Sequence, residues 1–152
     1  MMAAVERHTT PSRPRRAAGA RPTLEAAGRR STPQREAVYR YLAGVDHHPT
    51  AEEVYLAVKR RVPRVSLATV YTALEVLVRS GLASKLTYGD AAARYDVRTD
   101  AHSHARCLVC GRVRDLEIVP DAGWVRTLRT PGFEFTGFRF ELIGRCATCR
   151  RG

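Results

Sequence analysis

The sequence predicts an α+β chain in which a helical part ending in a hairpin precedes a smaller α/β part. Three observations support this class. Apolar residues recur at helical spacing in the first half of the chain. Short runs rich in β-branched and aromatic residues follow after the middle. Two Cys-x-x-Cys pairs bracket the second part, at 107–110 and 146–149, which favours a small unit stapled by a four-cysteine metal site.

The chain of 152 residues carries 26 basic and 15 acidic side chains, for a formal net charge of +11 and a pI of about 10.4. Such a basic balance is typical of proteins that bind a polyanion, most often nucleic acid, although an arginine-rich composition alone also produces it. No signal peptide or long apolar run is recognisable, so we expect a cytoplasmic protein without a membrane partner. In the cytoplasm, paired cysteines favour metal ligation over disulfides.

The domain boundaries follow changes in composition. Residues 1–21 are rich in Arg, Ala, Pro and Thr without apolar periodicity, and we predict a disordered basic tail there. This tail either touches nucleic-acid phosphates without sequence preference or is passive. We assign residues 22–97 to a first domain, which begins with a short helix over 24–27, residues 98–101 to a polar hinge, and residues 102–152 to a second domain.

Three helix starts in the first domain are marked by capping residues. Thr32 precedes Pro33, and proline is favoured at the first helical position. The segment 50–53, Thr-Ala-Glu-Glu, has the spacing of a capping box. Ser66 caps a third helix, which we expect over 67–80 because a glycine follows it as a stop.

A hairpin follows the third helix, with strands expected over 82–88 and 92–97. Three helices and a hairpin are the elements of a winged helix-turn-helix, whose recognition helix, here 67–80, enters the major groove of DNA. The outer face of this helix carries small polar residues, which either approach DNA or form an ordinary solvated surface. We predict that Arg35 contacts a DNA phosphate. The other predicted DNA contacts are Ser66, Thr69, Tyr71 and Thr72.

The second domain is predicted to mix strands and one helix. Strands are expected over 105–109, 112–118 and 133–143, and a helix over 121–129. We therefore expect a small α/β unit.

The four cysteines offer four thiolates to one ion. Four sulfur ligands suit tetrahedral Zn²⁺ and leave no open coordination position, so the expected role of the metal is structural. The gap between the pairs exceeds that of compact zinc ribbons, so the ion would join the first and last strands of the second domain. A redox dithiol or an iron–sulfur cluster is the alternative use of such pairs. The predicted zinc ligands are Cys107, Cys110, Cys146 and Cys149.

Two histidines stand one residue apart just before the first cysteine pair. On an extended segment, His102 and His104 point to the same side, so both imidazoles can reach one ion. This arrangement favours a second metal site that is rich in nitrogen and oxygen.

Several motifs together resemble the ferric uptake regulator (Fur) family, over about residues 22–150. The segments at 86–91, Leu-Thr-Tyr-Gly-Asp-Ala, and at 94–96, Arg-Tyr-Asp, are most similar to its peroxide-responsive repressor (PerR) group. The resemblance implies a homodimeric winged-helix repressor that binds a palindromic double-stranded operator when it is loaded with metal. The other motifs are Thr-Pro-Gln-Arg at 32–35, His-Pro-Thr-Ala-Glu-Glu-Val-Tyr at 48–55, Ser-Leu-Ala-Thr-Val-Tyr at 66–71, the His-x-His-x-x-Cys-x-x-Cys-Gly run at 102–111, and Gly-Arg-Cys-x-x-Cys at 144–149.

The resemblance also implies a regulatory site for Fe²⁺ or Mn²⁺. Three imidazoles and two carboxylates suit these ions by their hardness. Asp115 stands where the iron sensors of the family tend to carry Glu. Because the ligands come from both sides of the hinge, a bound ion would favour one arrangement of the two domains. The implied ligands are His48, Asp96, His102, His104 and Asp115.

The expected function is a metal-dependent repressor that senses peroxide. On this hypothesis, iron-catalysed oxidation of ligand histidines, His48 and His102 by resemblance, causes the release of operator DNA. An iron- or manganese-responsive regulator of metal uptake is the alternative, because it would use the same site. We expect no enzymatic activity, since a zinc hydrolase needs an open metal position and a general base such as the HExxH motif, which the sequence lacks. The net charge of +11 and the helix-turn-helix pattern argue against an interaction module without DNA binding.

Overall fold

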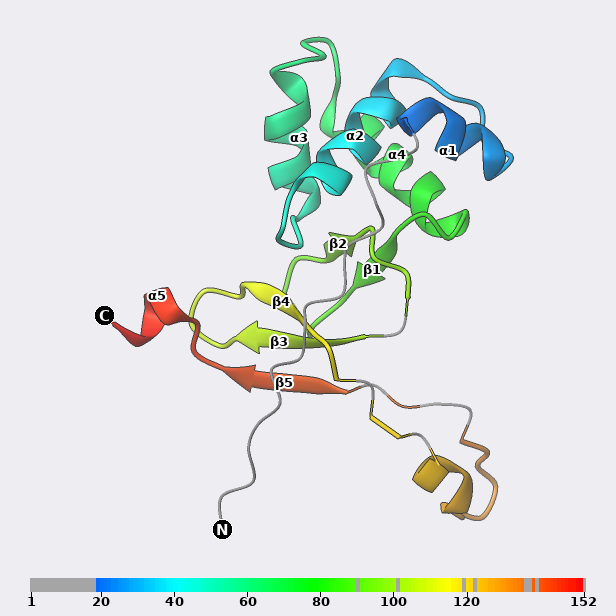
Figure 1. The fold of residues 1–152 in the computed structure, drawn as a ribbon, viewed down its shortest axis with the longest axis vertical. Helices are drawn as coiled ribbons and strands as arrows, with labels where there is room; N and C mark the ends of the chain where they lie inside the picture. The colour runs from blue at the N-terminus through cyan, green and yellow to red at the C-terminus, as the bar shows by residue number, and fades with distance from the viewer. Residues whose placement is uncertain are drawn as a thin grey trace. The chain divides into compact units, whose positions relative to one another are not determined.

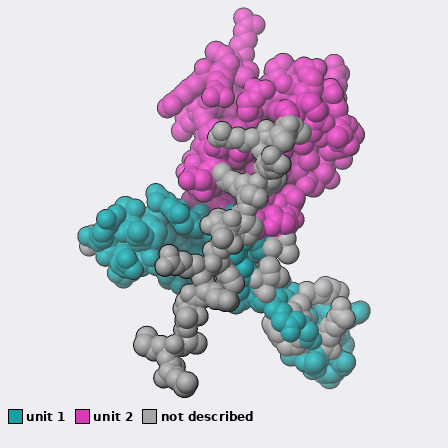
Figure 2. All heavy atoms as spheres, in the orientation of Figure 1, with its two compact units in different colours: residues 1–11, 101–152 teal, residues 12–100 magenta. Residues whose placement is uncertain are grey.

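The computed structural model describes residues 19–89, 91–100, 102–118, 120–121, 123–135, 138 and 140–151. Most of the predicted tail, 1–18, and one residue of the predicted hinge, 101, lie outside this description. The described residues form two compact units, 19–100 and 102–151, which Figure 2 shows in different colours. None of the described helices is both long and apolar enough to cross a membrane.

The first unit contains four helices, shown from blue to green in Figure 1: α1 (Ala20–Ala26), α2 (Pro33–Gly44), α3 (Ala51–Lys59) and α4 (Leu67–Arg79). The predicted caps are confirmed for the last three. The Thr32 and Ser66 side chains accept hydrogen bonds from the third backbone amides of their helices. Thr50 and Glu53 form the complete capping box, because each side chain accepts from the other's backbone N–H.

The helices pack around one apolar core because each has a buried stripe at helical spacing. Val70, Leu74 and Leu77 of α4 are fully buried, and each such side chain stabilises the fold by roughly 1.5–3 kcal/mol. Leu24 of α1 is also fully buried in this core. The helix begins at Ala20, earlier than the predicted start at 24, and Ala20 is buried together with Leu24. Residues 20 and 21 therefore belong to this helix and not to the predicted disordered tail.

A two-stranded antiparallel sheet completes the first unit. β1 (Ser84–Leu86) pairs with β2 (Arg94–Asp96), so that Lys85 lies opposite Tyr95. Both strands are shorter than predicted. The Tyr95 side chain is only 1% exposed and anchors the sheet to the helical core. The Tyr95 backbone N–H also donates to the Pro49 carbonyl oxygen at 3.0 Å, which ties β2 to the loop before α3.

The second unit is built on a three-stranded sheet in the order β4-β3-β5. The central strand β3 (Ser103–Cys107) pairs antiparallel with β4 (Val113–Leu116) and parallel with β5 (Glu141–Gly144). A 3₁₀ helix, η1 (Gly123–Thr127), lies between β4 and β5 in the chain, and the short helix α5 (Ala147–Arg150) follows β5.

Two predictions for this unit are corrected. Among the described residues of the strand predicted over 133–143, the ladder is formed only from Glu141, and β5 continues to Gly144. β3 begins at Ser103 and offers no ladder partner to residues well before Glu141. A Gly132 with a φ of 74° also turns the chain just before Phe133. The helix predicted over 121–129 is the five-residue 3₁₀ helix η1, and α5 was not predicted because its four residues are too short for a periodic signal.

Candidate functional sites

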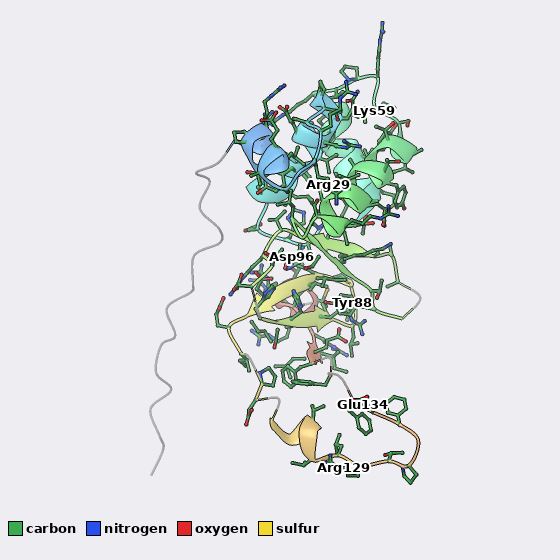
Figure 3. The ribbon with its side chains drawn as sticks, turned by 90° about the vertical axis from the view of Figure 1, so that its right-hand side faces the viewer. Arg29, Lys59, Tyr88, Asp96, Arg129 and Glu134 are labelled. Carbon is green, nitrogen blue, oxygen red and sulfur yellow. The ribbon has the colours of Figure 1, made fainter. Side chains whose placement is uncertain are left out.

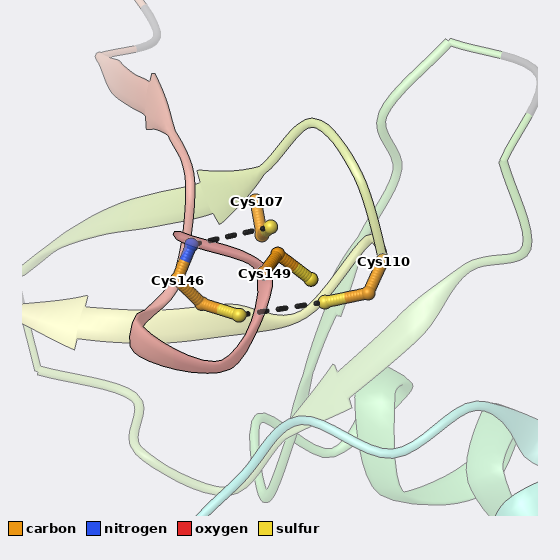
Figure 4. A group of neighbouring side chains, drawn as sticks. All are labelled: Cys107, Cys110, Cys146 and Cys149. Atoms are coloured by element: carbon orange, nitrogen blue, oxygen red, sulfur yellow. Dashed lines mark hydrogen bonds between the residues drawn. The ribbon is translucent and has the colours of Figure 1, made fainter. Parts of the chain in front are cut away.

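The four cysteines converge at one end of the β4-β3-β5 sheet (Figure 4). Cys107 ends β3, Cys110 follows in the next turn, and Cys146 and Cys149 lie at the start and in the middle of α5. Their Sγ atoms all lie within 4.8 Å of one another. The Sγ atoms of Cys110 and Cys146 are 3.7 Å apart, close to the edge of about 3.8 Å expected for a zinc tetrahedron with four sulfur ligands.

Local backbone geometry builds this cluster. Gly111 takes a φ of 68° and donates its N–H to the Cys107 carbonyl oxygen at 2.9 Å, closing the turn of the first Cys-x-x-Cys pair. The second pair arrives through the parallel pairing of β3 with β5, in which Cys107 lies opposite Gly144. The sequence folds this way because the two pairs directly follow the two paired strands.

Hydrogen bonds within the cluster change the pKa values of its thiols in opposite directions. The Cys146 backbone N–H donates to the Cys107 Sγ at 3.3 Å, and this hydrogen bond is the main cause that lowers the pKa of the Cys107 thiol to about 6. Cys110 and Cys146, in contrast, raise the pKa of Cys149 to about 12 through hydrogen bonds between the side chains. The lowered pKa favours the thiolate form of Cys107, and thiolates are the ligands that zinc requires.

A second group of metal-ligand side chains lies in the same unit. The His102 and His104 Nε2 atoms are 3.0 Å apart. The Asp115 Oδ1 lies 3.7 Å from the His102 Nε2 and 3.9 Å from the His104 Nε2. Asp115 reaches this position because it is the antiparallel partner of His104 across β3 and β4, and directly opposed side chains point to the same face. The spacing of His102 and His104 together with the register of β3 and β4 therefore brings two nitrogens and one oxygen within 3.9 Å of one another.

The other two predicted ligands meet in the first unit. The Nε2 of His48 lies 3.3 Å from the Oδ2 of Asp96, and both side chains are almost completely buried. The Arg94 guanidinium donates to the His48 carbonyl oxygen at 2.7 Å, and the Arg98 backbone N–H donates to the Asp96 Oδ1 at 2.8 Å. Figure 3 labels Asp96, at the end of β2. The structure thus assembles the five predicted ligands as two groups, one in each unit.

The residues predicted to contact DNA gather at the first turns of α2 and α4. Arg35, Thr69 and Thr72 line one groove of about 290 Å³ between these helices. The Ser66 hydroxyl lies beside it, 2.8 Å from the Thr69 hydroxyl. Tyr71 is 41% exposed and belongs to the outer face of α4. The structure therefore brings three of the five residues to one groove, with Ser66 beside it and Tyr71 on a neighbouring surface.

Three residues with direct contacts to these groups were not predicted as functional. Arg94 and Arg98 position the His48–Asp96 pair through the hydrogen bonds described above, and Glu52 accepts a hydrogen bond from the Tyr71 hydroxyl at 2.7 Å. Glu52 lies within the capping box that the sequence shows, but a contact between two helices has no periodic pattern. The Arg-Tyr-Asp segment at 94–96 predicts Asp96 as a metal ligand, but nothing in the sequence indicates that its Arg94 positions His48.

Comparisons with known proteins agree with these features. A sequence profile of the ferric uptake regulator family matches residues 26–137. The peroxide operon regulator of Bacillus subtilis is 41% identical over 131 residues, which cover 85% of this chain and 90% of the relative. The solved structure of the Campylobacter jejuni peroxide stress regulator matches with a TM-score of 0.60 and 26% identity, over 85% of this chain and 95% of that one. That of the Pseudomonas aeruginosa ferric uptake regulator with manganese matches with a TM-score of 0.62 and 27% identity, over 84% and 98%. The chain belongs to the ferric uptake regulator family.

Proposed function

We propose that this protein is a metal-dependent, DNA-binding transcriptional repressor of the peroxide-responsive type, acting in the cytoplasm as a homodimer. The observation that carries the proposal is the pair of nitrogen and oxygen groups, one in each unit. His48 and Asp96 form the first group, and His102, His104 and Asp115 form the second. The similarity to a named peroxide operon regulator, over most of both chains, supports the same function.

The sulfur cluster is assigned to structural Zn²⁺. Four sulfur donors at tetrahedral separation leave no position for a substrate or signal, so this ion would hold β3, β5 and α5 together and take no part in sensing. Its ligands would be Cys107, Cys110, Cys146 and Cys149.

The nitrogen and oxygen groups are assigned to one regulatory Fe²⁺ or Mn²⁺. Three imidazoles and two carboxylates form the donor set that these ions prefer over softer metals. An ion that takes ligands from both groups can bind only when the two units adopt one particular arrangement. Its binding free energy therefore stabilises that arrangement relative to all others. The Nε2 of His48 and the Oδ2 of Asp96, two buried side chains of the first unit, lie 3.3 Å apart.

DNA binding is assigned to the first unit as a winged helix-turn-helix. α4 is the recognition helix, β1 and β2 form the wing, and Arg35 contacts a phosphate beside the groove that Thr69 and Thr72 also line. The net charge of +11 favours association with DNA. A palindromic operator would match the two-fold symmetry of a homodimer.

Dimerisation is assigned to the second unit. β5 is an edge strand of the sheet, and its Leu142 and Ile143 side chains are 43% and 60% exposed. Phe133 and Phe140 of the same unit are 65% and 38% exposed. Apolar side chains gathered on a small unit are typical of a subunit interface, and an edge strand is a natural place for a second copy to pair.

Peroxide sensing follows from the proposed ligand set. Three nitrogens and two oxygens leave an octahedral ion one open position, and bound Fe²⁺ would supply the reduction of hydrogen peroxide there. The imidazoles of the three proposed ligands, His48, His102 and His104, would be the oxidisable groups nearest to that position. The resemblance to the peroxide-responsive group points to His48 and His102 as the two that are oxidised. An oxidised imidazole is a poor metal ligand, so the metal ion would dissociate. The two units would then no longer be held in one arrangement, and the protein would release its operator.

The direct test measures binding to palindromic and scrambled duplexes of equal length, using the zinc-containing protein with and without Mn²⁺. We expect Mn²⁺ to raise affinity for the palindrome and to leave binding to the scrambled duplex weak. Equal binding to both duplexes, with or without Mn²⁺, would contradict the proposed function.

A further inference from the structure

A carboxylate stands on the proposed DNA-reading surface, where negative charge is unfavourable. Glu52 is an exposed residue in the first turn of α3, and Tyr71 lies on the exposed face of α4. The Tyr71 hydroxyl donates to the Glu52 Oε1 at 2.7 Å, joining the two helices of the helix-turn-helix. A surface that meets phosphates is usually lined with basic or neutral groups, so an acidic residue there calls for a specific explanation.

The hydrogen bond fixes the chemical character of both groups. Because the phenol proton of Tyr71 points to Glu52, the phenol oxygen can only accept a further hydrogen bond. The same bond is the main cause that lowers the pKa of Glu52, so its carboxylate is ionised at neutral pH and also acts only as an acceptor. A carboxylate has about four lone-pair sites. Besides the bond from Tyr71, the Glu52 carboxylate accepts from its own backbone N–H and from the Thr50 side chain, so about one site is left for a ligand.

The hydroxyl of Thr72, the next residue of α4, is also restricted to accepting hydrogen bonds. Thr72 donates its hydroxyl proton to the Ala68 carbonyl oxygen at 3.0 Å, so its oxygen can also only accept a further hydrogen bond. Thr72 is exposed and lines the neighbouring groove between α2 and α4. The outer face near Tyr71 therefore presents acceptors to a ligand.

We propose that Glu52 is a specificity-determining residue, which holds Tyr71 as an acceptor and selects a base whose exocyclic amino group lies in the major groove. In the major groove, adenine N6 and cytosine N4 are donors, whereas thymine O4 and guanine O6 are acceptors. Glu52 and Tyr71 together match adenine or cytosine on the strand they face and repel thymine or guanine there. This inference rests on the proposed DNA-binding function.

The carboxylate also discriminates against non-specific DNA. The phosphates of any DNA repel this negative charge, whatever the base sequence. The repulsion is offset only where the amino group of a base donates a hydrogen bond to the carboxylate. Removal of the charge should therefore strengthen non-specific binding while it weakens sequence preference. A residue with a purely structural role would lower both together.

The test uses the full-length, Mn²⁺-loaded protein and a duplex selected by the wild type from a randomised library. Each base pair of one half-site is then inverted in turn, which moves the amino group to the other strand. Wild type should lose about 5- to 150-fold in affinity at the inverted pair that faces Glu52 and Tyr71. Glu52→Gln should lose most of that penalty and bind a scrambled duplex more tightly, and Tyr71→Phe should lose the same positional preference.

Glu75→Gln is the matched control. Glu75 is a solvent-accessible carboxylate like Glu52, but it lies on α4 and pairs with Lys85 at 3.2 Å and not with Tyr71. This variant should keep the inversion penalty at every position. The inference is wrong if Glu52→Gln and Tyr71→Phe keep the full penalty at every base pair, or if Glu75→Gln reproduces the loss. If the wild type selects no sequence from the library, the proposed function itself fails instead.

Discussion

The Nε2 of His48 and the Oδ2 of Asp96 lie 3.3 Å apart inside the first unit, although the two residues are distant in sequence. The loop that carries His48 is tied to β2 by two hydrogen bonds, from the Tyr95 N–H to the Pro49 carbonyl oxygen and from the Arg94 side chain to the His48 carbonyl oxygen. These two hydrogen bonds hold the loop of His48 against the strand that carries Asp96, and so orient the two side chains toward each other. Such preorganisation lowers the entropy that metal binding must overcome.

Arg94→Ala should weaken regulatory metal binding. The Arg94 guanidinium is 2.7 Å from the carbonyl oxygen of His48, so its loss frees the loop that positions the imidazole. Residues that orient metal ligands typically change affinity about 10- to 100-fold. Mn²⁺ titration followed by calorimetry would measure this effect. Lys85→Ala, on the neighbouring strand β1, is the control and should leave Mn²⁺ affinity unchanged.

Cys107→Ser and Cys146→Ser should each abolish structural zinc and the folded dimer. Structural zinc sites supply on the order of 10 kcal/mol to folding, comparable to the whole stability of a domain. Metal analysis, circular dichroism and analytical ultracentrifugation would follow zinc content, folding and dimerisation. Thr148→Ala, between Cys146 and Cys149, should behave like the wild type. A zinc-free cysteine variant that remains a folded dimer would rule out the structural role.

Arg35→Ala should weaken binding to all duplexes by a similar factor, because a phosphate contact carries no sequence information. The slope of log affinity against log salt should become shallower by about one unit per lost contact in each half-site. Arg79→Ala, at the opposite end of α4, removes the same charge and should leave the slope close to that of the wild type. An unchanged affinity and slope for Arg35→Ala would contradict the docking proposed for the helix-turn-helix.

Local features of this fold were predictable from sequence because they depend on nearby residues. Thr32, Ser66 and the Thr50–Glu53 box cap helices through bonds to residues three positions away. The convergence of the cysteines was also predictable, since each pair is a local turn and one ion needs four ligands. The ends of the strands were predicted less accurately, because a strand extends only as far as the neighbouring strand that it pairs with.

The functional groups were predictable only where a motif or a resemblance marks them. The spacing of His102 and His104 indicates a shared direction, but the position of Asp115 opposite His104 depends on the register of β3 with β4. The partnership of Glu52 with Tyr71 depends on how α3 packs against α4, which no short segment encodes. Long-range packing therefore accounts for the residues that sequence reasoning missed.

The last prediction concerns the signal. After peroxide treatment of the iron-loaded protein, peptides containing His48 or His102 should gain one oxygen, and the protein should release its operator. The manganese-loaded protein should bind DNA and remain unmodified, because Mn²⁺ does not readily reduce peroxide. Tryptic peptides covering residues 41–59 and 99–106 contain these histidines, and fragment-ion mass spectrometry would separate them from His47 and His104.

His47 provides a matched control for this experiment. It precedes His48 directly, but its side chain is 42% exposed, whereas that of His48 is 3% exposed. His47→Ala should therefore keep peroxide-dependent release, and His48→Ala should lose metal-dependent DNA binding before any peroxide is added. Release of DNA from the iron form with both peptides unmodified would exclude histidine oxidation as the switch. Iron-loaded protein that keeps its operator after peroxide would instead favour a regulator of metal uptake, which uses the same ligands to report the metal itself.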